Sequence, residues 1–114
     1  MDASRKIGQL GEEMAAGVLM ARGYELLCRN YACPYGEIDL IVRKNKKISF
    51  VEVKTRTSLL LERPAEAVDL QKSARIRNAA RSFMAKTRWV YEAVDFQVIE
   101  IFIEQTEAPE WQEG

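Results

Sequence analysis

Two carboxyl groups and a lysine stand out for the chemistry that they could perform together. Asp39 and Glu52 each lie in a strongly apolar stretch of the chain, and Lys54 follows Glu52 in a Glu-x-Lys pattern. A charged side chain in such a stretch is costly unless it is paired or binds a cation. Two carboxylates can hold a divalent metal ion, and a lysine beside them can orient water and offset charge on a phosphate. We therefore predict a metal-dependent phosphodiesterase site, with surface salt bridges as the alternative.

The residue types that are missing narrow the chemistry further. The chain contains no histidine, which excludes imidazole as a general base or a metal ligand. A site of oxygen ligands favours Mg²⁺ or Mn²⁺ over zinc. The two cysteines, Cys28 and Cys33, are too few for a disulfide framework and match no common zinc spacing. We interpret them as reduced, small apolar residues.

The carboxylates are expected to meet across a β-hairpin. Residues 37–43 and 48–54 are β-rich and apolar, and a short polar loop joins them. If the turn centres on Asn45 and Lys46, Asp39 faces Glu52, with Cβ atoms roughly 4.5–5.5 Å apart. A three-residue turn would instead shift the register by one position. The two-residue turn is therefore the hypothesis that brings the carboxylates together.

Further groups could complete this site. Lys54 shares a face with Glu52, because alternate strand residues point the same way. Glu37 would face Lys54 in the same register, so both a salt bridge and a metal contact are open to it. The backbone carbonyl of Val53 is a further candidate metal ligand. Glu12, on the first predicted helix, could add a metal contact or support the ligands from across the sheet, whereas Glu13 points about 100° away around that helix.

The apolar pattern predicts the order helix, three strands, helix, strand. The helices are expected over residues 4–22 and roughly 65–86, and the strands over 24–31, 37–43, 48–54 and 94–103. The buried face of the first helix is assigned to Ile7, Leu10, Met14, Val18 and Ala21. This order predicts an α/β fold with a mixed central sheet flanked by helices. We expect one domain over residues 1–105 and a flexible acidic tail over 106–114.

Charge is distributed unevenly along the chain. All 17 basic residues lie at or before Arg88, and seven of the 17 acidic residues follow it. A basic body suits a polyanion such as DNA, and a solvated surface is the alternative. We expect Arg56, Lys72 and Arg75 to contact phosphates. The second helical region also carries further basic residues: Arg77, Arg81, Lys86 and Arg88. The sequence shows neither a bilayer-spanning run nor a secretion signal, so we expect a cytoplasmic protein without a membrane partner.

Several motifs together resemble the bacterial YraN family, which is similar to the PD-(D/E)XK nucleases, including archaeal Holliday-junction resolvases. The resemblance covers about residues 4–103. Its motifs are Gly8-x-x-Gly11-Glu12-x-x-Ala15, Gly23-Tyr24, Arg29-Asn30, Gly36-Glu37-Ile38-Asp39-Leu40-Ile41, Phe50-Val51-Glu52-Val53-Lys54-Thr55-Arg56, Pro64-x-Glu66-Ala67-Val68 and Lys72. One departure is Arg63, where the family pattern has glycine before Pro64.

The resemblance implies a restriction-endonuclease-like core with the order αβββαβ. It implies magnesium as the cofactor and active-site positions at Glu12, Asp39, Glu52 and Lys54. We therefore expect an endonuclease that hydrolyses DNA, on branched or structured DNA by analogy with resolvases.

Other functions remain open at this point. One alternative is a nucleic-acid-binding or partner-binding module that keeps the fold without catalysis, and another is a plain structural domain. The intact carboxylate and lysine set argues against the binding module, and a structural domain would have to explain the charges on buried strands without a ligand. Junction cutting needs two sites, which is consistent with a homodimer, and the apolar run Leu59–Leu61 could contribute to its contact.

Overall fold

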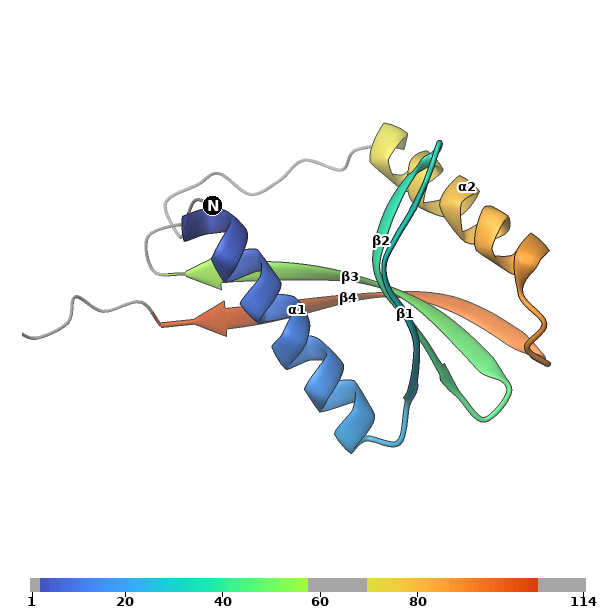
Figure 1. Ribbon diagram of the computed structural model, residues 1–114, viewed down its shortest axis with the longest axis horizontal. Helices are drawn as coiled ribbons and strands as arrows, with labels where there is room; N and C mark the ends of the chain where they lie inside the picture. Colours follow the sequence, from blue (N-terminus) through green and yellow to red (C-terminus); the bar gives the residue numbers. More distant parts are fainter. Residues whose placement is uncertain (1–2, 58–69, 105–114) are drawn as a thin grey trace, which may run out of the picture.

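The computed structural model describes residues 3–57 and 70–104 of the 114-residue chain. Two helices and four strands follow one another in the order αβββαβ, which confirms the predicted α/β architecture (Figure 1). The elements are α1 (Ala3–Ala21), β1 (Glu25–Cys33), β2 (Gly36–Lys44), β3 (Lys47–Thr57), α2 (Leu70–Lys86) and β4 (Ala93–Ile103). The run Leu59–Leu61, the departure at Arg63, the start of the second helical region before Leu70 and the acidic tail lie outside the described residues.

The four strands form one mixed sheet in the order β1-β2-β3-β4. β1 pairs antiparallel with β2, β2 pairs antiparallel with β3, and β3 pairs parallel with β4. The most apolar strands, β2 and β3, are therefore central, as their composition predicts. Lys44 pairs with Lys47, so the turn contains two residues as expected, and Asn45 adopts a φ of 57° there. Over the described residues, neither helix has the length and apolarity that a membrane span requires.

The two helices cover opposite faces of the sheet. Ala15, Ala16 and Leu19 of α1 pack with Leu40, Val42 and Val51, whereas Ala79 and Ala80 of α2 pack with Ile38, Ile41, Ile48 and Phe50. Phe50 and Val51 are neighbours on β3, and neighbouring strand residues point to opposite faces. The second core also contains Cys28 and Cys33, which are free thiols as predicted.

The predicted buried face of α1 was wrong. The larger apolar residues Leu10, Met14 and Val18 are 45%, 44% and 42% exposed, and the helix packs instead through Gly11, Ala15, Ala16 and Leu19. The reason is a close approach between α1 and β3. A Cβ added to Gly11 would lie 2.9 Å from the Cβ of Thr55, closer than real Cβ atoms pack. The contact therefore selects the smallest side chains, and the longer ones lie at its margin.

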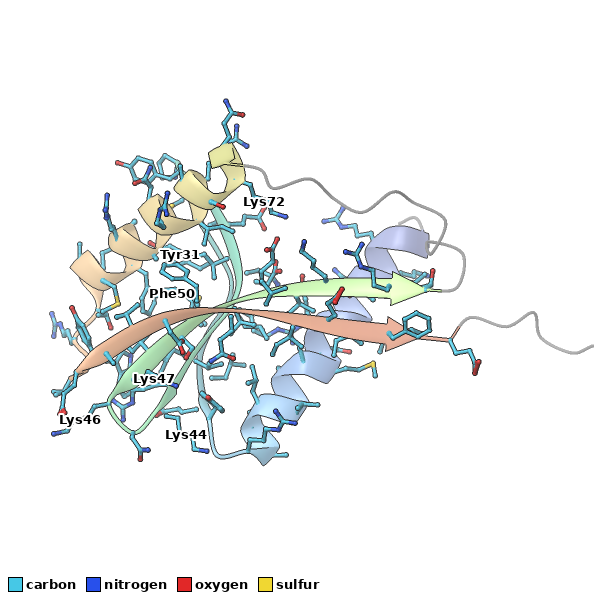
Figure 2. All side chains as sticks on the ribbon, turned by 180° about the vertical axis from the view of Figure 1, so that it is seen from behind. Tyr31, Lys44, Lys46, Lys47, Phe50 and Lys72 are labelled. Carbon is cyan, nitrogen blue, oxygen red and sulfur yellow. The ribbon has the colours of Figure 1, made fainter. Side chains whose placement is uncertain are left out.

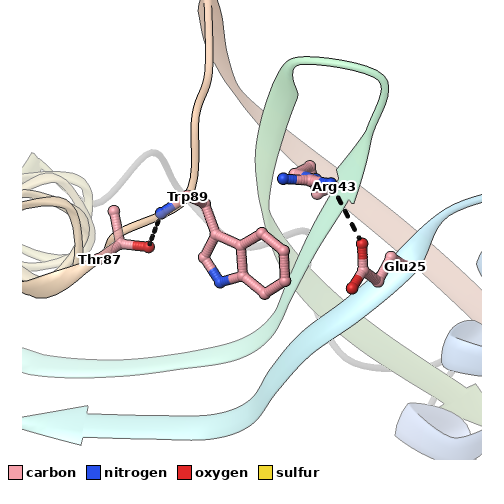
Figure 3. Close-up of polar contacts among 4 residues, drawn as sticks. All are labelled: Glu25, Arg43, Thr87 and Trp89. Atoms are coloured by element: carbon pink, nitrogen blue, oxygen red, sulfur yellow. Dashed lines mark hydrogen bonds and ion pairs between the residues drawn. The ribbon is translucent and has the colours of Figure 1, made fainter.

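The connection from α2 to β4 is fixed against the β2–β3 hairpin (Figure 3). The Trp89 ring centroid lies 4.4 Å from the Arg43 guanidinium carbon, a cation–π contact. Arg43 also lies 3.6 Å from a Glu25 carboxylate oxygen on β1. The Glu92 amide donates a 2.6 Å hydrogen bond to the Lys46 carbonyl in the hairpin turn. These contacts start β4 beside β3 and so set their parallel register.

Candidate active site

The central pair of strands separates at Asp39. Pairing between β2 and β3 has the predicted register from the turn as far as Leu40 opposite Val51, and ends there. β2 stays paired with β1 beyond this point, and the two strands curve away from β3 together (Figure 1). The predicted backbone pairings of Asp39 with Glu52 and of Glu37 with Lys54 were therefore wrong. The hairpin opens before it reaches the carboxylates.

A side chain replaces the backbone ladder at the point of separation. The Val53 amide donates a 2.7 Å hydrogen bond to Oδ2 of Asp39. A carboxylate that accepts a backbone N–H competes with strand pairing for that donor, which explains why the ladder stops here. Asp39 is thereby anchored to β3.

Asp39 lies in an environment that disfavours its charge. Burial raises the pKa of its carboxyl group above the ordinary value, and the nearby carboxylates of Glu52 and Glu37 raise it further. The Val53 hydrogen bond and the Lys72 ammonium act in the opposite direction, and the net shift is upward. A half-buried carboxyl group whose pKa is raised by burial and by neighbouring carboxylates is typical of cation sites and of catalytic sites. The observation favours the functional interpretation of Asp39 over a surface salt bridge.

Glu52 faces a cavity of about 790 Å³ between α2 and the sheet. Asp39, Glu37 and Val53 also line this cavity on the sheet side, and Lys72 and Arg75 are among its lining residues on α2. Lys72 lies in the first turn of α2 (Figure 2), and it makes a direct ion pair with the Glu52 carboxylate. The structure thus places two of the predicted phosphate-binding residues directly opposite the predicted metal ligands.

Glu12 reaches Asp39 from the other face of the sheet. Burial raises the pKa of the Glu12 carboxyl group, and the charge of Asp39 raises it further. A hydrogen bond from the Asn30 side chain lowers the pKa without reversing the net upward shift. The close approach at Gly11 explains how a residue of α1 comes so near the sheet. Glu12 therefore lies within electrostatic range of Asp39.

Asn30 is a site residue to which the sequence interpretation gave no role. It lies on β1 between the partners of Leu40 and Ile38, and so beside Asp39. Its φ is 51°, in the left-handed region that asparagine tolerates better than most residues. Non-glycine residues held in this region are often found at functional sites. The sequence did contain a signal, the Arg29-Asn30 motif. This motif contributed to the family resemblance, but its residue types alone suggested no chemical role.

The other predicted site residues, which are basic, lie at different distances from the carboxylates of Asp39 and Glu52. Lys54 follows Glu52 by two positions on β3 and shares its face, although it is not among the residues that line the cavity. Arg56 lies further along the same strand, with its Nε 3.6 Å from a carboxylate oxygen of Glu100 on β4. Arg75 lies over the β1–β2 turn, where its Cβ is 3.4 Å from a Cβ added to Gly36. Of the three expected phosphate contacts, Lys72 and Arg75 adjoin the carboxylates most directly.

The donor set suits a magnesium ion that keeps part of its water. Within the described ranges, no three acidic or cysteine side chains form a ready-made cluster of metal ligands. Two carboxylates, Asp39 and Glu52, adjoin the Val53 backbone, whose carbonyl is a third oxygen donor. Mg²⁺ is commonly held by one or two carboxylates, with water and substrate phosphate as its other ligands. These oxygen donors therefore fit a Mg²⁺ ion, provided that water and a phosphate supply its remaining ligands.

Comparison with known proteins supports the family resemblance. Residues 11–101 match the family described as "Uncharacterised protein family UPF0102". A UPF0102 protein of Caldicellulosiruptor bescii is 40% identical over 104 residues, covering 88% of this chain and 85% of the relative. A second, from Moorella thermoacetica, is 37% identical and covers 90% and 86% of the two chains. A third, from Nocardia farcinica, is 41% identical and covers 85% and 76%. With its motifs, fold and relatives in agreement, the chain belongs to the UPF0102 family, the YraN family that its sequence resembles.

Proposed function

We propose that the protein is a magnesium-dependent nuclease that hydrolyses phosphodiester bonds in DNA, with branched or otherwise structured DNA as its substrate by analogy with resolvases. One observation carries this proposal. The sheet opens at Asp39, so that carboxylates from β2 and β3 line a cavity whose opposite wall is basic, and Glu12 of α1 lies near Asp39 on the other side of the sheet. Carboxylates alone would repel a phosphodiester, and arginine and lysine alone would only bind it. Together with a divalent cation they provide both binding and activation.

The residues divide into two groups around the scissile phosphate. Asp39, Glu52 and the Val53 carbonyl would hold the cation, which polarises the phosphate and lowers the pKa of water. Lys72 and Arg75 lie across the cavity, where they can neutralise phosphate oxygens. Attack of water on phosphorus with cleavage of the P–O3′ bond leaves a 5′-phosphate and a 3′-hydroxyl. Lys54 is assigned to orient that water and to offset charge on the developing phosphorane.

Glu12 and Asn30 act around this centre. Their hydrogen bond fixes the Glu12 carboxyl group near Asp39, from the face opposite the cavity. A carboxylate in this position stabilises the orientation of Asp39 or of water bound to the cation. We assign Asn30 as a positioning residue, since its contact is with Glu12 and not with the substrate.

Cleavage assays with matched variants test the proposal. The wild-type protein is incubated with single-stranded, duplex, flapped and four-way DNA in Mg²⁺ or Mn²⁺. Cleavage is expected on at least one substrate, and Asp39→Ala and Lys54→Ala are expected to abolish it. Glu12→Gln should reduce cleavage, whereas Glu13→Gln, one position away on the exposed side of α1, should leave it unchanged. Cleavage that persists in Asp39→Ala would come from another site or a contaminant.

A second candidate function is nucleic-acid binding without turnover. The specific observation that favours it is the ion pair between Lys72 and Glu52, because the ammonium group of Lys72 already offsets the charge of one predicted metal ligand. Isothermal calorimetry separates the two functions. A nuclease should bind Mg²⁺ or Mn²⁺ through Asp39, and a binding module should bind DNA equally well in a chelator and in magnesium. Binding to every DNA form without cleavage in either metal would favour the second function.

A further inference from the structure

Within residues 3–57 and 70–104, one part of the sheet is left exposed on the α2 side. Among the described residues, α2 packs over β1, β2 and the β3 residues Ile48 and Phe50, and its small residues Ala79 and Ala80 are buried in that contact. The same face of β4 lies beyond the helix. Phe96, on β4, is 49% exposed although it is a large apolar residue. The helix and this strand therefore form the two sides of an open groove.

Phe96 is a supported aromatic platform in that groove. Its ring stacks on Phe50, with centroids 5.5 Å apart and planes inclined by 29°. Phe50 is buried between α2 and the sheet and has an edge contact with Phe83 (Figure 2). One face of the Phe96 ring thus packs on the buried Phe50 ring, and Phe96 remains half exposed. A flat, rigid, exposed ring of this kind is suited to stacking with another flat group.

The groove is continuous with the carboxylate cavity. A second hollow of about 530 Å³ lies along α2 towards β4, and Phe50, Phe96 and Arg77 line both hollows. Tyr91 and Arg81 line the second hollow. A chain that enters past Tyr91 therefore passes Phe96 before it reaches Asp39 and Glu52.

The helical wall of the groove is strongly basic. α2 carries five basic residues and no acidic one. Arg77 and Arg81 are exposed and lie one helical turn apart, on the side that lines the second hollow. No ion pair joins either of them to a carboxylate within the described part of the chain. Uncompensated guanidinium groups above an aromatic floor match the alternating phosphates and bases of a nucleic-acid strand.

We propose that this groove binds an unpaired DNA segment and leads it to the carboxylate site, with a base stacked on Phe96 and phosphates held by Arg77 and Arg81. The proposal rests on the proposed phosphodiesterase function for the destination of the strand. It requires an unpaired segment, because a base inside a duplex is already stacked on both faces and has none left for Phe96. It thereby assigns a substrate class: DNA with a single-stranded portion next to the bond that is cut.

Equilibrium binding tests the groove independently of cleavage. Fluorescence anisotropy is measured in a chelator, so that no hydrolysis occurs, with a labelled single strand and a duplex of the same sequence. We expect tighter binding of the single strand. Phe96→Leu keeps an apolar side chain on Phe50 but removes the stacking face, and should weaken single-strand binding about fivefold or more. Phe102→Leu is the matched control, because Phe102 is 56% exposed on the same face of β4 and lines neither hollow.

The arginines supply a second, independent measurement. Arg77→Gln and Arg81→Gln should each reduce the dependence of affinity on salt by about one unit of slope. Lys86→Gln, on the same helix but outside both hollows, should leave the slope unchanged. Thermal unfolding verifies that each variant is folded. These exposed arginine variants keep the test decisive even if Phe96→Leu perturbs the sheet.

The outcomes separate this proposal from the one on which it rests. Equal affinity for single strand and duplex, or equal effects of Phe96→Leu and Phe102→Leu on single-strand affinity, would overturn the proposal that the groove binds an unpaired strand. Concentration-dependent self-association that Phe96→Leu abolishes would show that a second copy covers the platform, and would also overturn it. If wild type binds single strands through Phe96 but cuts no DNA, the groove stands and the nuclease fails. If wild type cuts DNA and Phe96→Leu changes neither affinity nor substrate preference, the nuclease stands and the groove fails.

Discussion

Substitution of Gly11 by alanine tests the packing that brings Glu12 to the site. In an exposed helix interior this change stabilises a protein by about 0.5–1 kcal/mol, because glycine has more backbone entropy to lose. At Gly11 the added methyl group would overlap the Thr55 side chain, including its Cβ and Cγ2 at 2.9 Å each. Overpacking of this kind costs about 1–3 kcal/mol. The net expectation is a destabilisation of about 0–2 kcal/mol.

The same helix provides the control. Gly8 and Gly17 lie in α1, and a Cβ built at either position meets nothing within 4 Å. Gly8→Ala and Gly17→Ala should therefore stabilise the protein by the full helix-propensity term of about 0.5–1 kcal/mol. The difference between Gly11→Ala and these controls isolates the clash, at about 1–3 kcal/mol, or roughly 4–12 °C in melting temperature for a domain of this size.

Urea denaturation and thermal melts of the three variants measure this difference. A double variant, Gly11→Ala with Thr55→Ala, removes two of the three overlapping atoms and should recover part of the lost stability. Gly11→Ala should also weaken metal binding, because α1 must shift and carry Glu12 away from Asp39. If Gly11→Ala is as stable as Gly8→Ala, α1 does not lie as close to β3 as described, and the placement of Glu12 in the site is refuted.

Three further perturbations address the electrostatics of the site. Burial raises the pKa of the Asp39 carboxyl group in the folded protein above its ordinary value of 3.8. Protonated Asp39 therefore contributes its full stabilisation at a pH below 3.8, and this stabilisation is lost as the pH rises through the pKa of the folded protein. Asp39→Asn should therefore make the metal-free protein more stable than wild type at neutral pH, with the gap in melting temperature closing under acid; a gap that widens would contradict the shift. Asn30→Gly keeps the positive φ and loses the hydrogen bond to Glu12, whereas Asn30→Ala also pays roughly 1–2 kcal/mol for the left-handed backbone. Denaturation should rank Asn30→Ala below Asn30→Gly, and equal stability would exclude strain at this position. Lys72→Met should strengthen Mg²⁺ binding up to about fivefold in calorimetry, since a partly exposed ion pair with Glu52 is worth about 1 kcal/mol or less, and the same change should weaken DNA binding.

Local patterns in the sequence were sufficient to predict the elements and their order. Alternation of apolar residues and the two-residue turn at Asn45 and Lys46 predicted the hairpin register correctly as far as Leu40. The next pair depends on a competition between a carboxylate and a carbonyl for the Val53 amide. The periodicity of a strand contains no information about that competition. The prediction therefore extended the β2–β3 pairing beyond Leu40 and Val51, where it ends.

The packing of α1 shows a second limit. A hydrophobic pattern assigns the burial of a helix face to its largest apolar residues, and it ranks glycine and alanine low. Here the short distance between α1 and the sheet determines which face of the helix is buried. Only small residues fit in the contact, as at Gly11 and Ala15. The placement of Glu12 had to come from the family resemblance, because it depends on this tertiary distance. Asn30 was missed for a related reason, since its hydrogen bond to Glu12 joins β1 to α1 and so depends on the tertiary structure.

The hydrogen bond between the Val53 amide and Asp39 also makes the site observable from the backbone. An amide inside a regular ladder exchanges its proton with solvent only when the strands open. The partner of the Val53 amide is instead a titratable side chain, so its exchange should respond to protonation or metal binding at Asp39 while its ladder neighbours, such as Val51, stay constant. Hydrogen exchange at this single amide would thus report occupancy of the site without substrate or catalysis, and identical responses at Val53 and Val51 would show that the carboxylate does not hold that amide.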